Sequence, residues 1–222
     1  MADPVRVFVG VDPRQPLGYN VLQYSLHRYS SRRVIVEPLM LHKLPITRRG
    51  LTEFTYSRYL VPHLCGFEGS AIFMDADIVV TGDIGELIDQ ADPQYAVQVN
   101  TEQPKFEWAS VMLFNNANCR NLTPEWINDP DSKPQALEWG DVGSFTPEWN
   151  YCVGVTPPAP AKLYHYTQGL PCWYETRGLD EDIHWLTAFK EMQHTVSWKE
   201  LMGSSVHAKP VLARLYQRLT GP

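Results

Sequence analysis

The chain has 222 residues, of which 44% are hydrophobic and 20% are charged, and its formal net charge is −6. This length suits one ample domain with a sizeable core, and we expect a single domain over residues 1–222. The acidic balance disfavours a diffuse phosphate-binding surface, and it therefore argues against nucleic acid as a partner.

The first half of the chain alternates between strand and helix patterns. Apolar, β-branched runs predict strands over residues 5–11, 33–36 and 71–78. A helix is expected between the first two strands, where Leu22, Leu26 and Tyr29 share one face, and another is expected over residues 52–64. This alternation predicts an α/β fold with a mixed, mostly parallel central sheet flanked by helices.

The second half has shorter elements. Strands are expected over residues 95–99 and 110–114, helical turns over 122–138, an extended connector over 156–160, and helices over 180–193 and 206–219. The last helix carries basic residues beside an apolar stripe. We favour an ordinary surface helix there, and the alternative is peripheral contact with an anionic membrane.

Three features bear on the cellular compartment. The N-terminus reads as a strand and not as a positively charged signal peptide, and no run approaches the roughly 20 apolar residues of a membrane span. The cysteines are widely spaced and include no C-x-x-C pair, so reduced thiols are expected. These features favour a cytoplasmic location.

The segment FMDADIVVTGD, residues 73–83, places Asp75 and Asp77 where a strand becomes a loop. Ligands of open α/β sheets gather at the carboxyl ends of strands. Two converging carboxylates repel unless a cation joins them, and hard oxygen ligands favour Mn²⁺ or Mg²⁺, which could hold a diphosphate. The alternative is a pair of loop aspartates facing water. Apolar runs on both sides of the pair favour the metal-binding interpretation.

The segments YSRYLVPHL and AIFMDADIVVTGDIGEL resemble the donor half of GT-A glycosyltransferases, in particular family 8, which contains glycogenin and bacterial galactosyltransferases. The resemblance implies a nucleotide-binding half over about residues 1–90 and an acceptor half over about residues 91–222. The donor-binding residues that it implies are Val11, Asp12, Arg58, Asp75, Ala76 and Asp77.

A second segment, HYTQGLPCW, is similar to the H-x-x-G-x-x-K-P-W motif of family 8. This similarity implies that His165 completes a metal site with Asp75 and Asp77, and that Gly169 and Trp173 contact the donor. For His165 alone, the other interpretation is a packed histidine among aromatic residues. The lysine of the motif is absent here, and the cations considered as substitutes are Lys162, Arg58 and Arg177.

The D-Q-D motif that approaches the transferred sugar in family 8 is also absent. The candidate that we favour in its place is Asp141, in QALEWGD, and a solvated loop acid is an equal alternative. The polar lead-in to the strand at residues 110–114 is likewise missing, since Trp108-Ala-Ser stands there.

Together these features predict a metal-dependent glycosyltransferase with Mn²⁺ or Mg²⁺ as cofactor. The expected partners are a nucleotide-sugar donor, with UDP favoured, and a carbohydrate or glycolipid acceptor that is attacked with retention of configuration. Two alternatives stay open: a non-catalytic protein that binds a sugar nucleotide or glycan, and a nucleotide-sugar phosphohydrolase.

Overall fold

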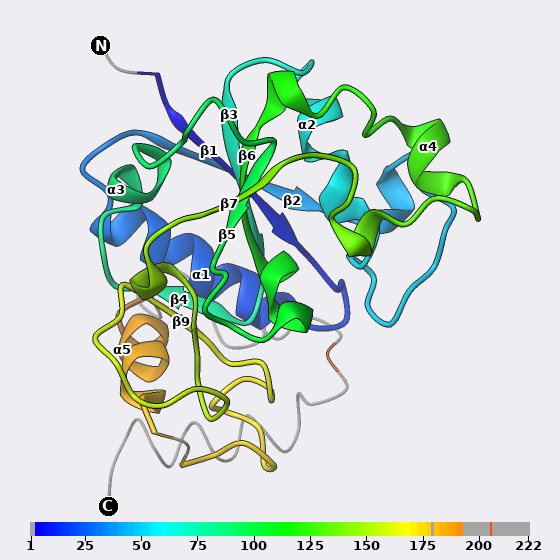
Figure 1. Cartoon of the computed structure of the whole chain (residues 1–222). Coiled ribbons are helices and arrows are strands. Elements are labelled where there is room, and N and C mark those ends of the chain that lie inside the picture. Colours follow the sequence, from blue (N-terminus) through cyan, green and yellow to red (C-terminus); the bar gives the residue numbers. More distant parts are fainter. Residues whose placement is uncertain (1–2, 179, 193–204, 206–222) are drawn as a thin grey trace, which may run out of the picture.

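The computed structural model describes residues 3–178, 180–192 and 205. A larger sheet forms the centre of the molecule (Figure 1). Its strands are, in spatial order, β2 (Val34–Leu39), β1 (Val5–Gly10), β3 (Ser70–Asp75), β6 (Val111–Asn115), β5 (Val97–Val99) and β7 (Val142–Ser144). All of them run in one direction except β6, so the predicted mixed, mostly parallel sheet is confirmed.

A second sheet has the strand order β4 (Ile78–Val80), β9 (Leu163–His165) and β8 (Tyr151–Cys152). The α-helices are α1 (Pro16–Tyr29), α2 (Val61–Leu64), α3 (Ile84–Ile88), α4 (Pro124–Asn128) and α5 (Asp182–Met192). The 3₁₀ turns are η1 (Leu41–Lys43), η2 (Ser57–Leu60), η3 (Lys105–Ser110), η4 (Asn116–Asn118), η5 (Pro134–Ala136) and η6 (Pro147–Trp149).

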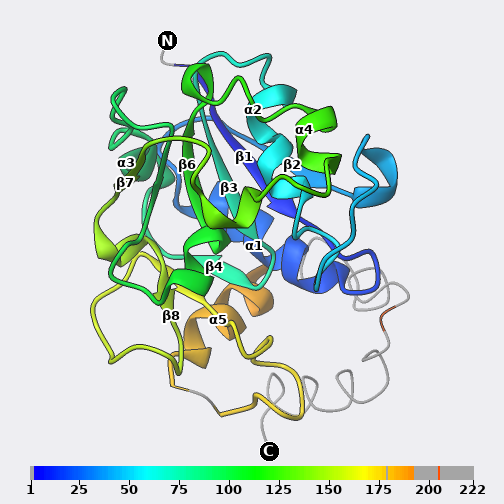
Figure 2. The ribbon, with the colours of Figure 1, turned by 45° about the vertical axis from the view of Figure 1, so that its right-hand side comes forward.

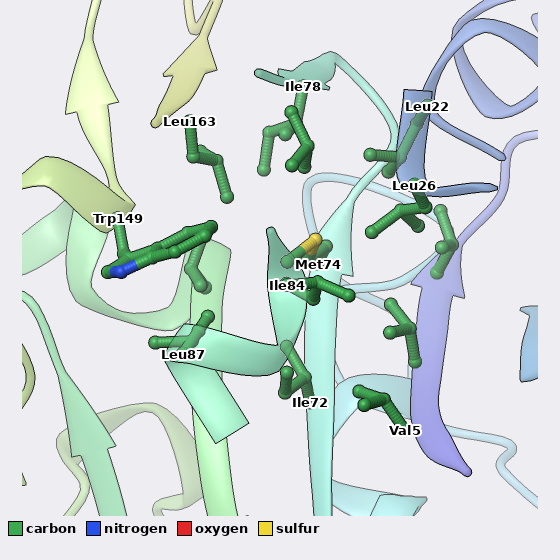
Figure 3. Close-up of a cluster of buried hydrophobic side chains, with 14 of the residues drawn as sticks. Val5, Leu22, Leu26, Ile72, Met74, Ile78, Ile84, Leu87, Trp149 and Leu163 are labelled. Atoms are coloured by element: carbon green, nitrogen blue, oxygen red, sulfur yellow. The ribbon is translucent and has the colours of Figure 1, made fainter. Parts of the chain in front are cut away.

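Side chains that alternate along the strands fill a core on each face of the larger sheet. On one face, Ile72 and Met74 of β3 pack with Leu22 and Leu26 of α1 and with Ile84 of α3, as Figure 3 shows. The other face of the sheet is covered by η2, α2 and α4. Its core joins Phe8, Phe73, Met112, Phe114, Tyr59 and Ile127. Helices packed on both faces of the sheet hold its strands in place, and with them the residues at the carboxyl ends of the strands.

The smaller sheet packs against both α1 and α5, and α5 lies beside β8 in Figure 2. Val79 and Tyr164 of this sheet pack with Leu17 of α1 and with Trp185 and Phe189 of α5. The rings of Trp185 and Phe189 are stacked, with centroids 5.4 Å apart. Helix α1 therefore supports both sheets and fixes their relative position.

The structure differs from the predicted elements at two places near the paired aspartates. Residues 52–56 form turns and not the start of a helix, and the helical turns begin only at η2. Thr52 N donates to Thr55 Oγ1 at 3.0 Å, and such side-chain bonds compete with helix formation. The strand expected over residues 71–78 is split into β3 and β4, because the chain leaves one sheet at Asp75 and enters the other at Ile78.

Further predictions concern the end of α1, the cysteines and the C-terminal helix. Of the three residues predicted to share one face of α1, Leu22 and Leu26 are buried, whereas Tyr29 is 38% exposed at the end of the helix. Cys65, Cys119 and Cys152 are free thiols. Within the part of the chain that the structure describes, no helix is long and apolar enough to cross a membrane. The helix expected over residues 206–219 lies outside the described residues.

Candidate functional site

The D-x-D turn lies at the junction of the two sheets. Asp75 is the last residue of β3, and Asp77 directly precedes β4. Helix α1 approaches this turn so closely that a Cβ on Gly18 would lie 2.7 Å from Ala76 O. Only glycine allows that approach, so the helix and both sheets together determine where the two carboxylates lie.

His165 comes to the turn through strand pairing. Strand β9 is antiparallel to β4, and the register sets Ile78 opposite His165. Tyr166 N donates to Asp77 O at 2.9 Å and continues this pairing past the strand end. As a result, His165 Nε2 lies 3.3 Å from Asp77 Oδ1, and the imidazole is 2% exposed.

Arg58 lies against the other carboxylate. Its Nη2 is 3.1 Å from Asp75 Oδ1, and both side chains are nearly buried. Its Nε donates to Phe54 O at 3.2 Å, its Nη1 donates to Ala109 O, and its guanidinium lies over the ring of Phe73 at 4.9 Å. These contacts hold the guanidinium in one place and leave it committed to Asp75.

Asp75, Asp77 and His165 each offer a ligand atom, and these atoms all lie within 4.8 Å of one another. Oδ1 of both aspartates is buried and accepts no hydrogen bond from the described residues, since the contacts with Arg58 and His165 are ion pairs without hydrogen-bond alignment. Buried carboxylate oxygens without a hydrogen bond are costly, and an ion placed between the two aspartates would meet both of them. Two carboxylates and an imidazole suit Mn²⁺, so the residues fit a divalent ion.

Without an ion, the carboxyl group of Asp75 and the imidazole of His165 both have pKa values above their ordinary values. Burial raises the pKa of Asp75 to about 7, and Arg58 opposes this rise while Asp77 adds to it. Burial lowers the pKa of His165, but the carboxylate of Asp77 and the nearby Cys152 outweigh it and raise that pKa well above its ordinary value. A metal ligand must lose its proton, so binding of an ion releases protons here.

A cavity of about 290 Å³ opens beside the D-x-D turn. Asp12, Ala76, Asp77 and Trp173 are among its lining residues. Arg14 Nη2 lies 2.7 Å from Asp12 Oδ2 and positions that carboxylate at the rim. Gly169 has a φ of 120°, and a Cβ there would lie 2.5 Å from the Trp173 ring, so this glycine lets the tryptophan reach the wall. The structure thus brings Asp12, Ala76, Gly169 and Trp173 together with the carboxylates.

Val11 plays a different part from Asp12. Its side chain is buried and its N donates to Leu39 O at 3.2 Å, so it extends the strand end and does not line the cavity. Its backbone places Asp12 at the rim.

Asp141 is not brought to this site, so our interpretation of it as a catalytic residue requires correction. It is exposed and precedes β7, at the end of the larger sheet opposite Asp75. Across the sheet, Val142 of β7 pairs with Val97 of β5, Val97 pairs with Phe114 of β6, and Phe114 pairs with Ala71 near the start of β3. Because β7 is parallel to β3, Asp141 at the start of β7 lies at the end of the sheet where β3 begins, and Asp75 lies where β3 ends.

The missing lysine had three candidate substitutes. Lys162 forms ion pairs with Glu86 and with Glu148, and Arg177 lies over the ring of Tyr174 at 4.5 Å. Among these three, Arg58 is the cation with a described contact to the D-x-D turn.

Glu107 is a residue of the site that sequence reasoning missed. It lies in η3, it is 8% exposed, and its Oε2 is 3.7 Å from His165 Nδ1. The signal in the sequence was weak: Glu107 is an acid between Phe106 and Trp108 that precedes a strand, whereas Asp75 and Asp77 follow one.

Comparison with solved structures defines the class of fold. The chain superimposes on the glycosyltransferase GlyE of Streptococcus pneumoniae with a TM-score of 0.63 at 16% identity, over 95% of this chain and 64% of GlyE. The galactosyltransferase LgtC gives a TM-score of 0.62 at 10% identity, over 89% of this chain and 100% of LgtC. The bifunctional glycosyltransferase WbbM gives 0.60 at 15% identity, over 97% of this chain and 52% of WbbM. The fold is that of GT-A glycosyltransferases, and the chain spans about two thirds of the length of GlyE.

Comparison of sequences gives the family. No family model matches the chain. It is 33% identical to protein CDI of Arabidopsis thaliana over 211 residues, an alignment that covers 78% of this chain and 80% of CDI. The chain belongs to the family of protein CDI.

Proposed function

We propose that the chain is a metal-dependent glycosyltransferase that moves a sugar from a nucleotide diphosphate donor to an acceptor hydroxyl. The observation that carries this proposal is the convergence of Asp75, Asp77 and His165, with ligand atoms within 4.8 Å of one another, beside a cavity that also contains Asp12 and Trp173. A cavity next to a cluster of buried ligand atoms is the arrangement that a nucleotide diphosphate with its cation requires.

Each residue has a distinct task in this proposal. Asp75, Asp77 and His165 hold the ion, and Arg58 keeps the Asp75 carboxylate in place. A bound Mn²⁺ or Mg²⁺ neutralises the charge that grows on the diphosphate as it leaves. Asp12 accepts hydrogen bonds from the ribose, and Trp173 offers an apolar face at the cavity wall.

We favour UDP as the nucleotide and retention of configuration, as the resemblance to family 8 implies. The acceptor is a carbohydrate or glycolipid hydroxyl that attacks from the face that the diphosphate leaves. Because Arg58 is already paired with Asp75, the charge on the leaving group falls mainly to the ion, so dependence on metal should be strong.

Product analysis tests this function. The purified protein is incubated with Mn²⁺, a panel of UDP- and GDP-sugars, and glycan or glycolipid acceptors, beside an Asp77→Asn variant. We expect a glycosylated product that needs Mn²⁺, an acceptor and Asp77. Release of nucleotide without an acceptor would identify a phosphohydrolase instead. Binding without any release would identify a non-catalytic binding protein.

A thermal-shift screen narrows the donor. A ligand that binds only the folded state stabilises it by about 2.7 kcal/mol at a concentration of 100 times its Kd. We expect UDP-sugars to raise the Tm with Mn²⁺ and not with EDTA. The cytoplasmic location stays a prediction from the sequence.

A further inference from the structure

A second cavity, of about 420 Å³, lies on the other side of the D-x-D turn. Asp77 and Ala76 line the first cavity, whereas Asp75 lines the second. Leu51 and Thr52 line both cavities, so the two are adjacent. A donor whose diphosphate meets the ion at the turn therefore has room for its nucleoside on one side and for its sugar on the other.

Glu107 lines this second cavity together with Asp75 and Arg58. Its backbone is held firmly, because Ser110 Oγ donates to Glu107 O at 2.5 Å and Asn150 Nδ2 donates to the same oxygen at 3.4 Å. Asn150 also donates to Ser110 Oγ at 3.0 Å. This buried network fixes the position from which the side chain extends.

The carboxylate of Glu107 has few polar contacts with the described residues. Among the described residues, it accepts no hydrogen bond, and its ion-pair contact is with His165 Nδ1 at 3.7 Å, which is too long for a hydrogen bond. Asp75, Asp77 and His165 form the proposed ion site without it, with ligand atoms within 4.8 Å of one another, although Glu107 also forms such a group with Cys152 and His165. A nearly buried carboxylate that lines a cavity without a hydrogen-bond donor is set up to meet a ligand group there.

We propose that Glu107 is a catalytic residue whose carboxylate faces the transferred sugar in the second cavity and stabilises the positive charge that develops at the anomeric carbon. This inference rests on the proposed function. In the transfer, the bond from the anomeric carbon to the diphosphate oxygen breaks and its electron pair stays on the diphosphate. The acceptor oxygen bonds to the anomeric carbon, and its proton passes to a diphosphate oxygen. Glu107 exchanges no atom, and a fixed negative charge beside this carbon lowers the barrier.

A positioning role through His165 makes a different prediction. If Glu107 only oriented the imidazole, its loss would weaken the ion site, because loss of a group that orients a metal ligand typically costs about 10- to 100-fold in metal affinity. A carboxylate that acts on the sugar leaves the affinities for Mn²⁺ and UDP nearly unchanged. Measurement of metal affinity therefore separates the two roles.

The experiment compares the wild-type chain with Glu107→Gln, which keeps the size of the side chain and removes its charge. Glu102→Gln, an exposed position on the same segment, is the matched control. Calorimetry gives the affinities for Mn²⁺ and, with Mn²⁺ present, for UDP. It also gives the affinity of the UDP and Mn²⁺ complex for a protonated iminosugar, which carries the positive charge of the transition state. Rates are measured with the donor that the wild type turns over.

For Glu107→Gln we expect Mn²⁺ and UDP affinities within about twofold of wild type, an iminosugar affinity at least about tenfold lower, and a kcat lower by about 100-fold with a similar KM. Glu102→Gln should match the wild type throughout. Glu107→Asp, which keeps the charge on a shorter side chain, should retain more iminosugar affinity than Glu107→Gln and provides the test if the glutamine variant does not fold.

Equal iminosugar affinity in wild type and Glu107→Gln would overturn the inference, and so would a loss of Mn²⁺ affinity large enough to explain the lower rate. If the wild type itself binds neither UDP nor GDP with Mn²⁺, the proposed function fails first, and this inference falls with it. The two failures are distinct because the UDP measurement does not involve the sugar.

Discussion

His165 Nε2 lies 3.3 Å from Asp77 Oδ1 because the antiparallel pairing of β4 with β9 sets Ile78 opposite His165. The two residues belong to segments far apart in the chain, and a strand register brings them together. A slip of one residue in this pairing would turn the imidazole to the opposite face of the small sheet. The distance between His165 and Asp77 in the candidate ion site therefore depends on the register of the β4–β9 pairing.

Replacement of Asp77 should separate ion binding from folding. We expect Asp77→Ala to abolish metal-dependent nucleotide binding and to leave the fold intact, because the residue stands at a turn and its Oδ1 accepts no hydrogen bond from the described residues. Calorimetry with UDP and Mn²⁺ measures the loss, and circular dichroism checks the fold. Asp141→Ala removes an exposed carboxylate at the other end of the sheet and serves as the control. Undiminished UDP affinity in Asp77→Ala would contradict the assignment of the ion site.

The metal-free protein should lose stability as pH rises. The folded-state pKa of Asp75, about 7, is above its ordinary 3.8, so this group stabilises the folded chain most below about pH 4, and that contribution is lost as pH rises through about 7. The raised pKa of His165 acts in the same direction at higher pH, from its ordinary 6.5 upward. Mn²⁺ needs both ligands without their protons, so its affinity should rise over the same range.

Melting curves at about pH 5.5, 6.5 and 8, recorded with EDTA or with Mn²⁺, test this linkage. We expect the stabilisation by Mn²⁺ to be largest at the highest pH. The Asp75→Asn variant has no carboxyl group to titrate and should show a flatter pH dependence without metal. A metal-free Tm that rises between pH 5.5 and 8 in the wild type, but not in this variant, would contradict the sign.

Arg58 should contribute to stability through its buried pairing with Asp75. Removal of one partner of a buried ion pair costs about 3–5 kcal/mol, and we expect Arg58→Ala to lie near the lower figure at about pH 8. The loss should be smaller at about pH 6, where Asp75 holds its proton. Urea unfolding measures both. Arg6→Ala breaks the more exposed pair between Arg6 and Glu37 and should cost less than about 1 kcal/mol. Equal losses for the two variants would show that burial of the Arg58 pair adds nothing.

Replacement of Gly18 by alanine should destabilise the protein, although alanine has the higher helix propensity. A glycine inside an exposed helix is usually about 1 kcal/mol less favourable than alanine. In α1, however, a Cβ at this position would lie 2.7 Å from Ala76 O, which is a backbone atom that cannot move without shifting the D-x-D turn. We therefore expect Gly18→Ala to destabilise the protein by about 1–3 kcal/mol and to weaken Mn²⁺ binding. His27→Ala, on an exposed part of the same helix, should change stability by less than about 0.5 kcal/mol. A more stable Gly18→Ala variant with normal Mn²⁺ affinity would contradict the close approach.

Local patterns in the sequence predicted the strands β1 and β2, the helix α1 and the acids at the end of β3, because periodicity and turn residues act between neighbours in the chain. The same patterns were misleading over residues 52–56, where the Thr55 hydroxyl accepts a hydrogen bond from Thr52 N. They also gave no sign that the chain changes sheets between Asp75 and Ile78.

The sequence by itself determined the α/β architecture and the chemistry of the carboxylates and the histidine. Only the tertiary structure decided which of the candidates meet: His165 reaches Asp77 through the β4–β9 register, Arg58 holds Asp75, Glu107 enters from η3, and Asp141 lies at the opposite end of the sheet. The physical reason is that local preferences depend on adjacent residues, whereas a site is made by strand order and by the packing of α1 against both sheets, which no short segment specifies.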